Sequence, residues 1–252
     1  MFPEFTLKSY NVLLKVMLQY GYKFQSFEQF LQNPFKRVVV LRHDVDKKPD
    51  NSLNIAGIES ELGIKSTYYF RIVKKSYNVE IIKRIIELGH EIGYHYEDVA
   101  LAKGDIAKAK KLFEEHLLLM RGLYPVKSIC MHGSPLSRYD NRQIWNQINY
   151  KDYDVIGEPY FDVDYNKVLY LTDTGRKWNN TDSAVRDKVE TKLDYSFKNT
   201  EAIINSIKND KFPDQVMMNI HPQRWTNNFF LWIHELLYQS LKNQIKKRLY
   251  VR

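Results

Sequence analysis

The sequence contains a single cysteine, Cys130, among its 252 residues. One thiol cannot form an intrachain disulfide framework, and it argues against a zinc site built from cysteines, so any metal must bind through histidine, aspartate or glutamate. No stretch approaches the roughly 18 consecutive apolar residues of a membrane-spanning helix. The N-terminus lacks the basic region, apolar run and small-residue cleavage site of a secretory signal, so we expect a cytoplasmic protein.

Internal repeats, low-complexity tracts and Pro/Gly-rich linkers are also absent from the sequence. The composition, 44% hydrophobic and 14% aromatic, is sufficient for a sizeable core, and the length falls within the range of one large α/β domain. We therefore expect a single domain over residues 1–252.

The formal net charge of +8 favours anionic partners such as acidic glycans, sugar nucleotides, nucleic acid or a membrane face, without selecting one. The densest basic run lies at the C-terminus and comprises Lys242, Lys246, Lys247, Arg248 and Arg252, interleaved with Leu241, Ile245 and Leu249. A solvated helix face is the simpler reading of this run, and peripheral membrane contact stays open. Nucleic-acid binding is not expected, because no helix-turn-helix, zinc-finger or aromatic-platform signature accompanies the charge.

Short β-branched runs alternate with amphipathic segments along most of the chain. The pattern predicts helices over residues 7–20, 53–62, 78–88 and 106–120, and strands over 38–41, 67–72, 91–93, 128–131, 168–172 and 216–220. Strands alternating with helices of this length indicate βαβ units and a parallel sheet, either open or closed as a barrel. In such folds the functional residues collect at the C-terminal ends of the strands.

Histidine or aspartate follows five of these predicted strands directly. The segments are Arg42–Asp46, Tyr94–Glu97, His132–Pro135, Asp173–Arg176 and His221–Pro222. A single such residue is more often a turn former or helix cap than a catalyst, but several at one edge of a sheet predict a functional site. His90, just after a helix-ending glycine, is instead expected to donate to a backbone carbonyl.

The pair Asp44 and Asp46, together with histidines from other strands, suits a hard or borderline divalent cation. Zinc is the expected ion, because it accepts both carboxylate oxygen and imidazole nitrogen. A metal held by two or three protein groups leaves a position for water, lowers the pKa of that water and polarises an amide carbonyl. The residues therefore indicate a metal-dependent hydrolase.

These motifs resemble those of the polysaccharide deacetylase (NodB-homology) family, also called family-4 carbohydrate esterases, over roughly residues 37–225. The resemblance implies a distorted (β/α) barrel, here with extra N- and C-terminal helices. Leu41–Asp46 resembles the first motif in its D-x-D form, which implies that Asp44 is the general base and Asp46 a metal ligand. Glu87–His95 resembles the second motif, which implies that His95 binds the metal.

The second motif of the family carries another metal-binding histidine four residues later, and that position here is Val99. The third ligand must therefore come from elsewhere in the chain. We prefer His132 for this role, with Glu97 as the alternative. The segment Cys130–Pro135 occupies the place of the third motif but lacks the arginine of that motif.

The last two motifs bear on the remaining catalytic groups. Asp173–Trp178 resembles the fourth motif, which implies that Asp173 or Arg176 holds the general base or the general acid in orientation. Asn219–Pro222 resembles the fifth, which implies that His221 is the general acid. Two further expectations concern flanking residues: Arg42 and His43 fix the carboxylates, and Trp178 and Trp225 either pack in the core or line a sugar-binding groove.

The resemblance implies removal of an acetyl or related acyl group from an amino sugar. In the cytoplasm, a nucleotide-linked or lipid-linked intermediate of surface polysaccharide biosynthesis is a better candidate substrate than a finished wall polymer. Two alternatives stay open. One is a hydrolase of a small non-sugar amide such as a cyclic imide or ureide. The other is a catalytically inactive carbohydrate-binding scaffold of the same fold, suggested by Val99 and by the missing arginine.

Overall fold

The structure is a computed structural model that describes residues 3–135, 137–178 and 186–250, without the side chains of 245–250. Most of the C-terminal basic run, Lys246, Lys247, Arg248 and Arg252 with Ile245 and Leu249, therefore lies outside the described side chains. Among the described residues, no helix combines the length and the apolar character needed to cross a membrane.

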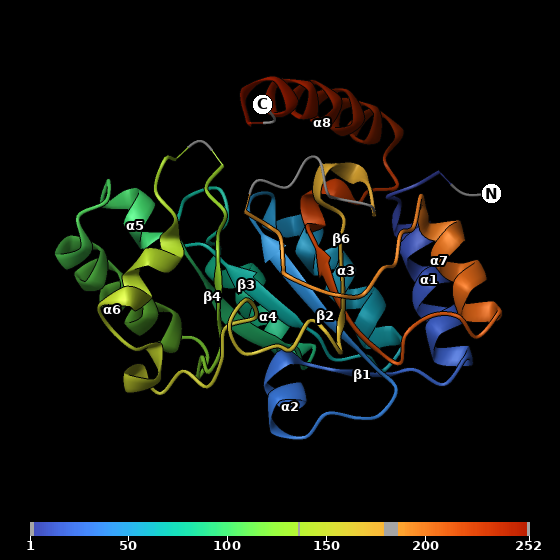
Figure 1. Cartoon of the computed structure of the whole chain (residues 1–252), viewed down its shortest axis with the longest axis horizontal. Helices are drawn as coiled ribbons and strands as arrows, with labels where there is room; N and C mark the ends of the chain where they lie inside the picture. Colours follow the sequence, from blue (N-terminus) through green and yellow to red (C-terminus); the bar gives the residue numbers. More distant parts are fainter. Residues whose placement is uncertain (1–2, 136, 179–185, 251–252) are drawn as a thin grey trace.

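A seven-stranded parallel sheet forms the centre of the molecule, in the order β5-β4-β3-β2-β7-β6 with β1 also paired to β2. The strands are β1 (Lys23–Gln25), β2 (Val38–Val45), β3 (Thr67–Phe70), β4 (Glu91–Tyr96), β5 (Ile129–Met131), β6 (Leu169–Thr172) and β7 (Gln215–Ile220). The sheet curls into a half-barrel with helices on its outside (Figure 1). This arrangement confirms the predicted α/β class and the distorted (β/α) barrel.

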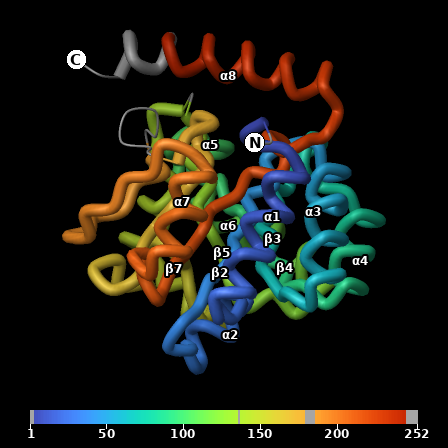
Figure 2. The backbone as a smooth tube through the Cα atoms, turned by 90° about the vertical axis from the view of Figure 1, so that its right-hand side faces the viewer, coloured from blue at the N-terminus to red at the C-terminus, as the bar shows by residue number. Residues whose placement is uncertain are grey.

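The α-helices are α1 (Leu7–Gln19), α2 (Phe27–Gln32), α3 (Pro49–Glu61), α4 (Val79–Glu87), α5 (Asp98–Leu101), α6 (Ile106–Arg121), α7 (Thr200–Lys208) and α8 (Phe229–Tyr250). Four 3-10 helices accompany them: η1 (Asn141–Asn146), η2 (Tyr150–Tyr153), η3 (Thr174–Arg176) and η4 (Pro222–Arg224). Helix α1 begins at a capping box formed by Thr6 and Ser9 and lies beside α7, while α8 lies across the top of the molecule (Figures 1 and 2). The expected N- and C-terminal helices are thus present.

Two strands are longer than the sequence pattern predicted, and this difference positions the site. Strand β2 continues from Leu41 to Val45, and β4 continues from Gly93 to Tyr96. The predicted ends were wrong because polar residues follow the apolar runs there. The backbone stays in the sheet, since Arg42–Val45 pair with β3 and Tyr94–Tyr96 pair with β5.

Because side chains alternate along a strand, β2 sends its polar residues to opposite faces of the sheet. Arg42 and Asp44 lie on one face, where they contact each other. His43 lies on the other face and contacts Glu59 of α3, with 2.7 Å between Nε2 and Oε1. Only the first face holds the candidate site, so the expectation that His43 fixes a site carboxylate is wrong, whereas Arg42 does so.

Candidate metal centre

Three side chains from different strands converge at the carboxyl edge of the sheet. Asp46 follows β2, His95 lies near the end of β4, and His132 follows β5. Asp46 Oδ1 lies 3.5 Å from the Nε2 atoms of both His95 and His132. Two ligands of a tetrahedral zinc, each at about 2.0–2.1 Å from the ion, lie roughly 3.4 Å apart, so each Asp46–histidine pair has the spacing of two ligands on one divalent cation.

The hydrogen bonding of the three residues leaves the converging atoms free for a ligand. Within the described part of the chain, Asp46 Oδ1 is buried without a hydrogen-bond partner. The Nδ1 atom of His95 lies 2.9 Å from the carbonyl oxygen of Cys130, and Nδ1 of His132 lies 2.9 Å from Glu97 Oε2. Donation from Nδ1 fixes each ring in the tautomer whose Nε2 carries a lone pair, as metal-binding histidines require.

Glu97 contacts Nδ1 of His132, the ring nitrogen on the side away from Asp46. Its carboxylate also accepts two hydrogen bonds from Arg71, at 2.8 and 2.7 Å. Burial alone would raise the pKa of Glu97, but the hydrogen bond from His132 and the charges of His132 and Arg71 lower it to about 2. Glu97 is therefore an anion that contacts Arg71, His132 and Ser134, and these contacts favour a supporting role for it over the alternative role of third ligand.

The charges around the three atoms suit a cation. Burial opposes ionisation of Asp46, yet the adjacent imidazoles of His132 and His95 hold its pKa well below the ordinary range. Burial lowers the pKa of His132 despite the attraction of Asp46 and Glu97, so this imidazole is biased toward the neutral form that binds metal. For His95, the carboxylates of Asp44 and Asp46 outweigh burial and raise the pKa.

A second set of three potential ligands overlaps the first: Asp44, His95 and Cys130 offer atoms that all lie within 4.8 Å of one another. Two features make it the weaker set. Burial raises the pKa of the Cys130 thiol well above its ordinary value, which disfavours the thiolate that a metal binds. Both oxygens of Asp44 already accept hydrogen bonds from Arg42.

Asp44 is held as a buried carboxylate beside the first set. Arg42 binds it in a bidentate manner at 3.0 and 2.8 Å, and Asn219 Nδ2 donates to Oδ2 at 3.0 Å. Although burial raises the pKa of Asp44, the charge of Arg42 and the nearby His95 lower it overall. Asp44 Oδ2 lies 3.8 Å from His95 Nε2, so an ionised carboxylate borders the candidate cation site.

His221 approaches the same space from β7, with its Nε2 atom 4.0 Å from Asp46 Oδ2. Asp173, which follows β6, lies 2.7 Å from His221 Nδ1 and accepts the backbone N–H of His221 at 2.9 Å. Trp225 Nε1 donates to Asp173 at 2.7 Å and Arg224 donates to it at 2.5 Å. Burial raises the pKa of Asp173, but the charges of Arg224 and His221 and the hydrogen bonds from His221 together lower it, so Asp173 orients the imidazole as an anion.

Two residues of the segment Asp173–Trp178, Arg176 and Trp178, lie away from the candidate metal centre. Arg176 donates to the backbone oxygen of Arg224 at 3.2 Å and lies over the rings of Phe5 and Trp232, so it contacts neither the predicted base nor the predicted acid. Its backbone is left-handed (φ 58°), which turns the side chain out of the site. Trp178 is buried in the core, as are Trp225 and Val99.

Three groups that border the site have no role in the sequence-based prediction. Arg224 lies one helical turn after His221, and this spacing is a sequence signal that the two side chains lie close together. Gln223 donates to Asp46 Oδ2 at 3.1 Å. Asp187 accepts from Thr172 and Thr174 at 2.8 and 2.6 Å beside Arg42, and no periodicity or motif marks its position.

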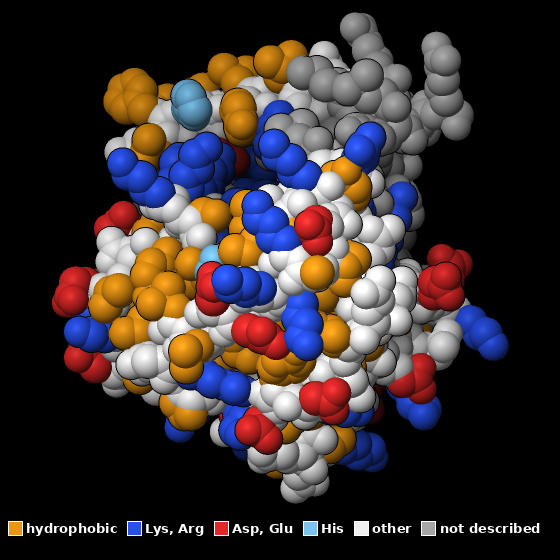
Figure 3. Space-filling model, turned by 90° about the vertical axis from the view of Figure 1, so that its left-hand side faces the viewer, with side chains coloured by type: hydrophobic (Ala, Val, Ile, Leu, Met, Phe, Trp, Pro, Cys, Tyr) orange, Lys and Arg blue, Asp and Glu red, His pale blue; other side chains and the backbone are white. Residues whose placement is uncertain are grey.

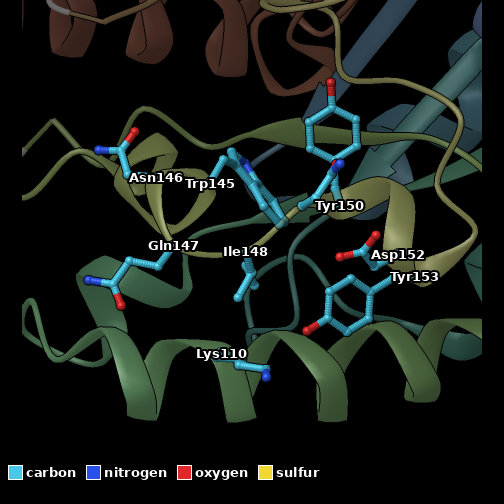
Figure 4. Close-up of a pocket in the computed structure, with 9 residues that line it drawn as sticks. Lys110, Trp145, Asn146, Gln147, Ile148, Tyr150, Asp152 and Tyr153 are labelled. Atoms are coloured by element: carbon cyan, nitrogen blue, oxygen red, sulfur yellow. The ribbon is translucent and has the colours of Figure 1, made fainter.

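An open pocket of about 790 Å³ lies elsewhere on the described surface, between α6 and the η1–η2 segment. It is lined by Lys110, Trp145, Asn146, Gln147, Ile148, Asn149, Tyr150, Asp152 and Tyr153 (Figure 4). None of the candidate ligands lines this pocket.

No protein-family model matches the chain, and no curated protein matches it. Solved structures similar to it include a CE4 family pseudoenzyme from Bacillus anthracis, at 15% identity and a TM-score of 0.46, covering 85% of this chain and 63% of that one. A peptidoglycan deacetylase from Bacillus subtilis is 13% identical (TM-score 0.40; 86% and 99% covered). A CE4 esterase from Streptococcus mutans is 12% identical (TM-score 0.45; 88% and 87% covered). The likeness concerns the overall fold, and the chemistry of the site follows from its own residues.

Proposed function

We propose that the chain is a metal-dependent deacetylase of the polysaccharide deacetylase family, which removes an acetyl group from the nitrogen of an amino sugar. The observation that carries the proposal is Asp46 Oδ1, buried without a hydrogen-bond partner in the described structure and 3.5 Å from two imidazole Nε2 atoms. A carboxylate and two imidazoles are ligands that an open divalent site would use, and zinc is the proposed ion. Such a cation, when bound, polarises the amide carbonyl and acidifies a water molecule.

Asp44 serves as the general base. Its bidentate contact with Arg42 fixes the orientation of the carboxylate and keeps it ionised. Asp44 Oδ2 lies 3.8 Å from His95 Nε2, and from this place the carboxylate would take the proton of the water molecule that attacks the acetyl carbon.

His221 serves as the general acid. Asp173 lies 2.7 Å from Nδ1, so a proton on Nε2 faces the site, where Nε2 lies 4.0 Å from Asp46 Oδ2. As the carbon–nitrogen bond breaks, His221 donates this proton to the sugar nitrogen, which leaves as a free amine while the acyl group leaves as acetate. General acid catalysis of this kind contributes about 10²–10⁴ in rate.

For the substrate, we propose an N-acetylated sugar linked to a nucleotide or a lipid, formed in the cytoplasm during surface polysaccharide biosynthesis. The net charge of +8 supports a substrate that carries phosphate, because a positive surface raises the local concentration of anions. The charge alone does not select the sugar.

The test is the metal content of the untagged protein by elemental analysis. We expect about one equivalent of zinc or a similar cation in the wild type, and loss of it in His95→Ala and in His132→Ala. His234→Ala is the matched control, since this exposed histidine lies on α8 away from the site. Acetate release from a panel of N-acetylated sugars, with cyclic imides and ureides beside them, follows on the metal-loaded protein.

Other outcomes point to other sites or functions. If Cys130→Ser loses the metal while His132→Ala keeps it, the set of Asp44, His95 and Cys130 is the site. If only His95→Ala loses it, the third ligand lies elsewhere. A wild type that holds no metal and takes none up contradicts the deacetylase and favours a carbohydrate-binding scaffold.

A further inference from the structure

Helix α8 turns its polar side toward the body of the protein. Glu235 is 3.6 Å from Lys47, which follows β2, and Asn243 Nδ2 donates to the backbone oxygen of Gly175, which follows β6, at 3.0 Å. Trp232 Nε1 donates to the backbone oxygen of Glu4 at 2.7 Å. These contacts fix α8 above the carboxyl edge of the sheet, where the candidate metal centre lies (Figures 1 and 2).

The opposite side of α8 is apolar and faces outward. Phe230, Leu237 and Leu241 are 80%, 66% and 58% exposed. Their spacing of seven and four residues puts them on one stripe of the helix. Figure 3 shows hydrophobic side chains along the ridge at the top of the molecule, with lysine and arginine side chains beneath them. An ordinary surface helix has the reverse arrangement, so another surface is needed to cover this stripe.

The charges at the stripe select the kind of surface. The sequence of α8 holds four basic residues and one acidic residue, and the acidic one, Glu235, is buried against the body. The ammonium groups of Lys47 and Lys242 lie 4.9 and 5.0 Å from the Tyr238 ring, at the edge of the stripe. A second copy of the chain would bring cation against cation, whereas an anionic lipid surface complements both the apolar stripe and its positive border.

We propose that α8 docks the protein on an anionic membrane surface, with Phe230, Leu237 and Leu241 inserted at the boundary between headgroups and acyl chains. The docking itself is independent of the catalytic proposal. Its consequence for the substrate rests on the proposed function: a helix that lies above the metal centre brings that centre close to the headgroup of a lipid-linked N-acetyl sugar.

The test is co-sedimentation of the full chain with vesicles of phosphatidylglycerol and phosphatidylcholine, and with vesicles of phosphatidylcholine alone. We expect binding to the anionic vesicles, weakened by salt, and little binding to the neutral ones. Leu237→Ser combined with Leu241→Ser is expected to weaken binding by about tenfold or more, because two large apolar side chains no longer leave water. Lys242→Glu tests the electrostatic part and is expected to weaken binding at low salt.

Leu118→Ser on α6 is the matched control, because Leu118 is 74% exposed yet lies on another helix. The proposal is overturned if the wild type does not bind anionic vesicles, if the control weakens binding as much as the α8 variant, or if the α8 variant dissociates a dimer seen by light scattering while vesicle binding is unchanged. Acetate release from a water-soluble N-acetylated sugar should be equal in wild type and α8 variant, so failure of docking and failure of catalysis are distinguishable.

Discussion

Glu59 in α3 is a fully buried carboxylate on the face of the sheet opposite the metal centre, and its charge should make the fold sensitive to acid. It accepts hydrogen bonds from Ser66 at 2.6 Å, from Tyr68 at 2.7 Å and from Tyr10. His43 Nε2 lies 2.7 Å from Oε1. Burial alone would raise the pKa of Glu59, but His43 and these hydrogen bonds lower it from 4.5 to about 2. We predict that Glu59→Gln removes this stabilisation.

The size of the effect follows from the shift. A pKa that falls from 4.5 in the unfolded chain to about 2 in the fold corresponds to about 3 kcal/mol of stability. Because the folded pKa is the lower one, this stability is fully present above pH 4.5 and is lost as the pH falls toward 2. The difference in unfolding free energy between wild type and Glu59→Gln should therefore be about 3 kcal/mol at pH 6 and shrink at lower pH.

The assay is urea denaturation of both proteins at several pH values between 6 and 2.5, read as the difference in unfolding free energy. Glu80→Gln is the control, since Glu80 is exposed and forms a surface ion pair with Lys83 at 3.7 Å that should contribute little. A difference that stays constant over this pH range would refute the reasoning, because it would show that the charge of Glu59 is not the source of the stability.

Two further predictions concern the groups that orient the proposed catalytic residues. Asp173→Asn keeps the shape of the side chain but removes the anion beside the imidazole of His221, the proposed general acid, so kcat should fall by roughly 10²–10⁴ with metal content unchanged. Arg42→Lys replaces a bidentate contact with Asp44 by a single one, and steady-state kinetics should show kcat lower by roughly tenfold, again with metal content unchanged. Loss of metal in either variant would assign the residue to the metal site instead.

Most of the sheet was predictable because buried parallel strands are nearly continuous apolar runs. Six of its strands begin within one residue of their predicted starts, as β3 does at Thr67. Strand β1 and helix α2 were not predicted, since Lys23–Gln25 is too short to show periodicity. The polar ends of β2 and β4 were misread as loops, because a site built inside the curl of a sheet places charged residues in regular strand positions.

Site residues that directly follow a predicted strand could be named from the sequence. Contacts between side chains far apart in the sequence could not. His132 was proposed from its place after a strand, and the structure brings it to Asp46 and His95. Arg176 was proposed as an orienting group on the same kind of argument, but a local backbone turn sends it elsewhere. Arg224, which was not predicted to have a role, contacts Asp173 instead, and this contact depends on the turn after His221.

The two departures from the family pattern have counterparts in the structure. Where the second motif has Val99, His132 presents an imidazole from β5, and where the third motif lacks arginine, Arg42 binds the predicted base from its own strand. A chain that served only as a scaffold would gain nothing from burying Asp46 Oδ1 without a partner, since an unsatisfied buried polar group costs about 1–3 kcal/mol and a charged one more. A bound cation would offset that cost, and this supports the proposed metal-dependent function.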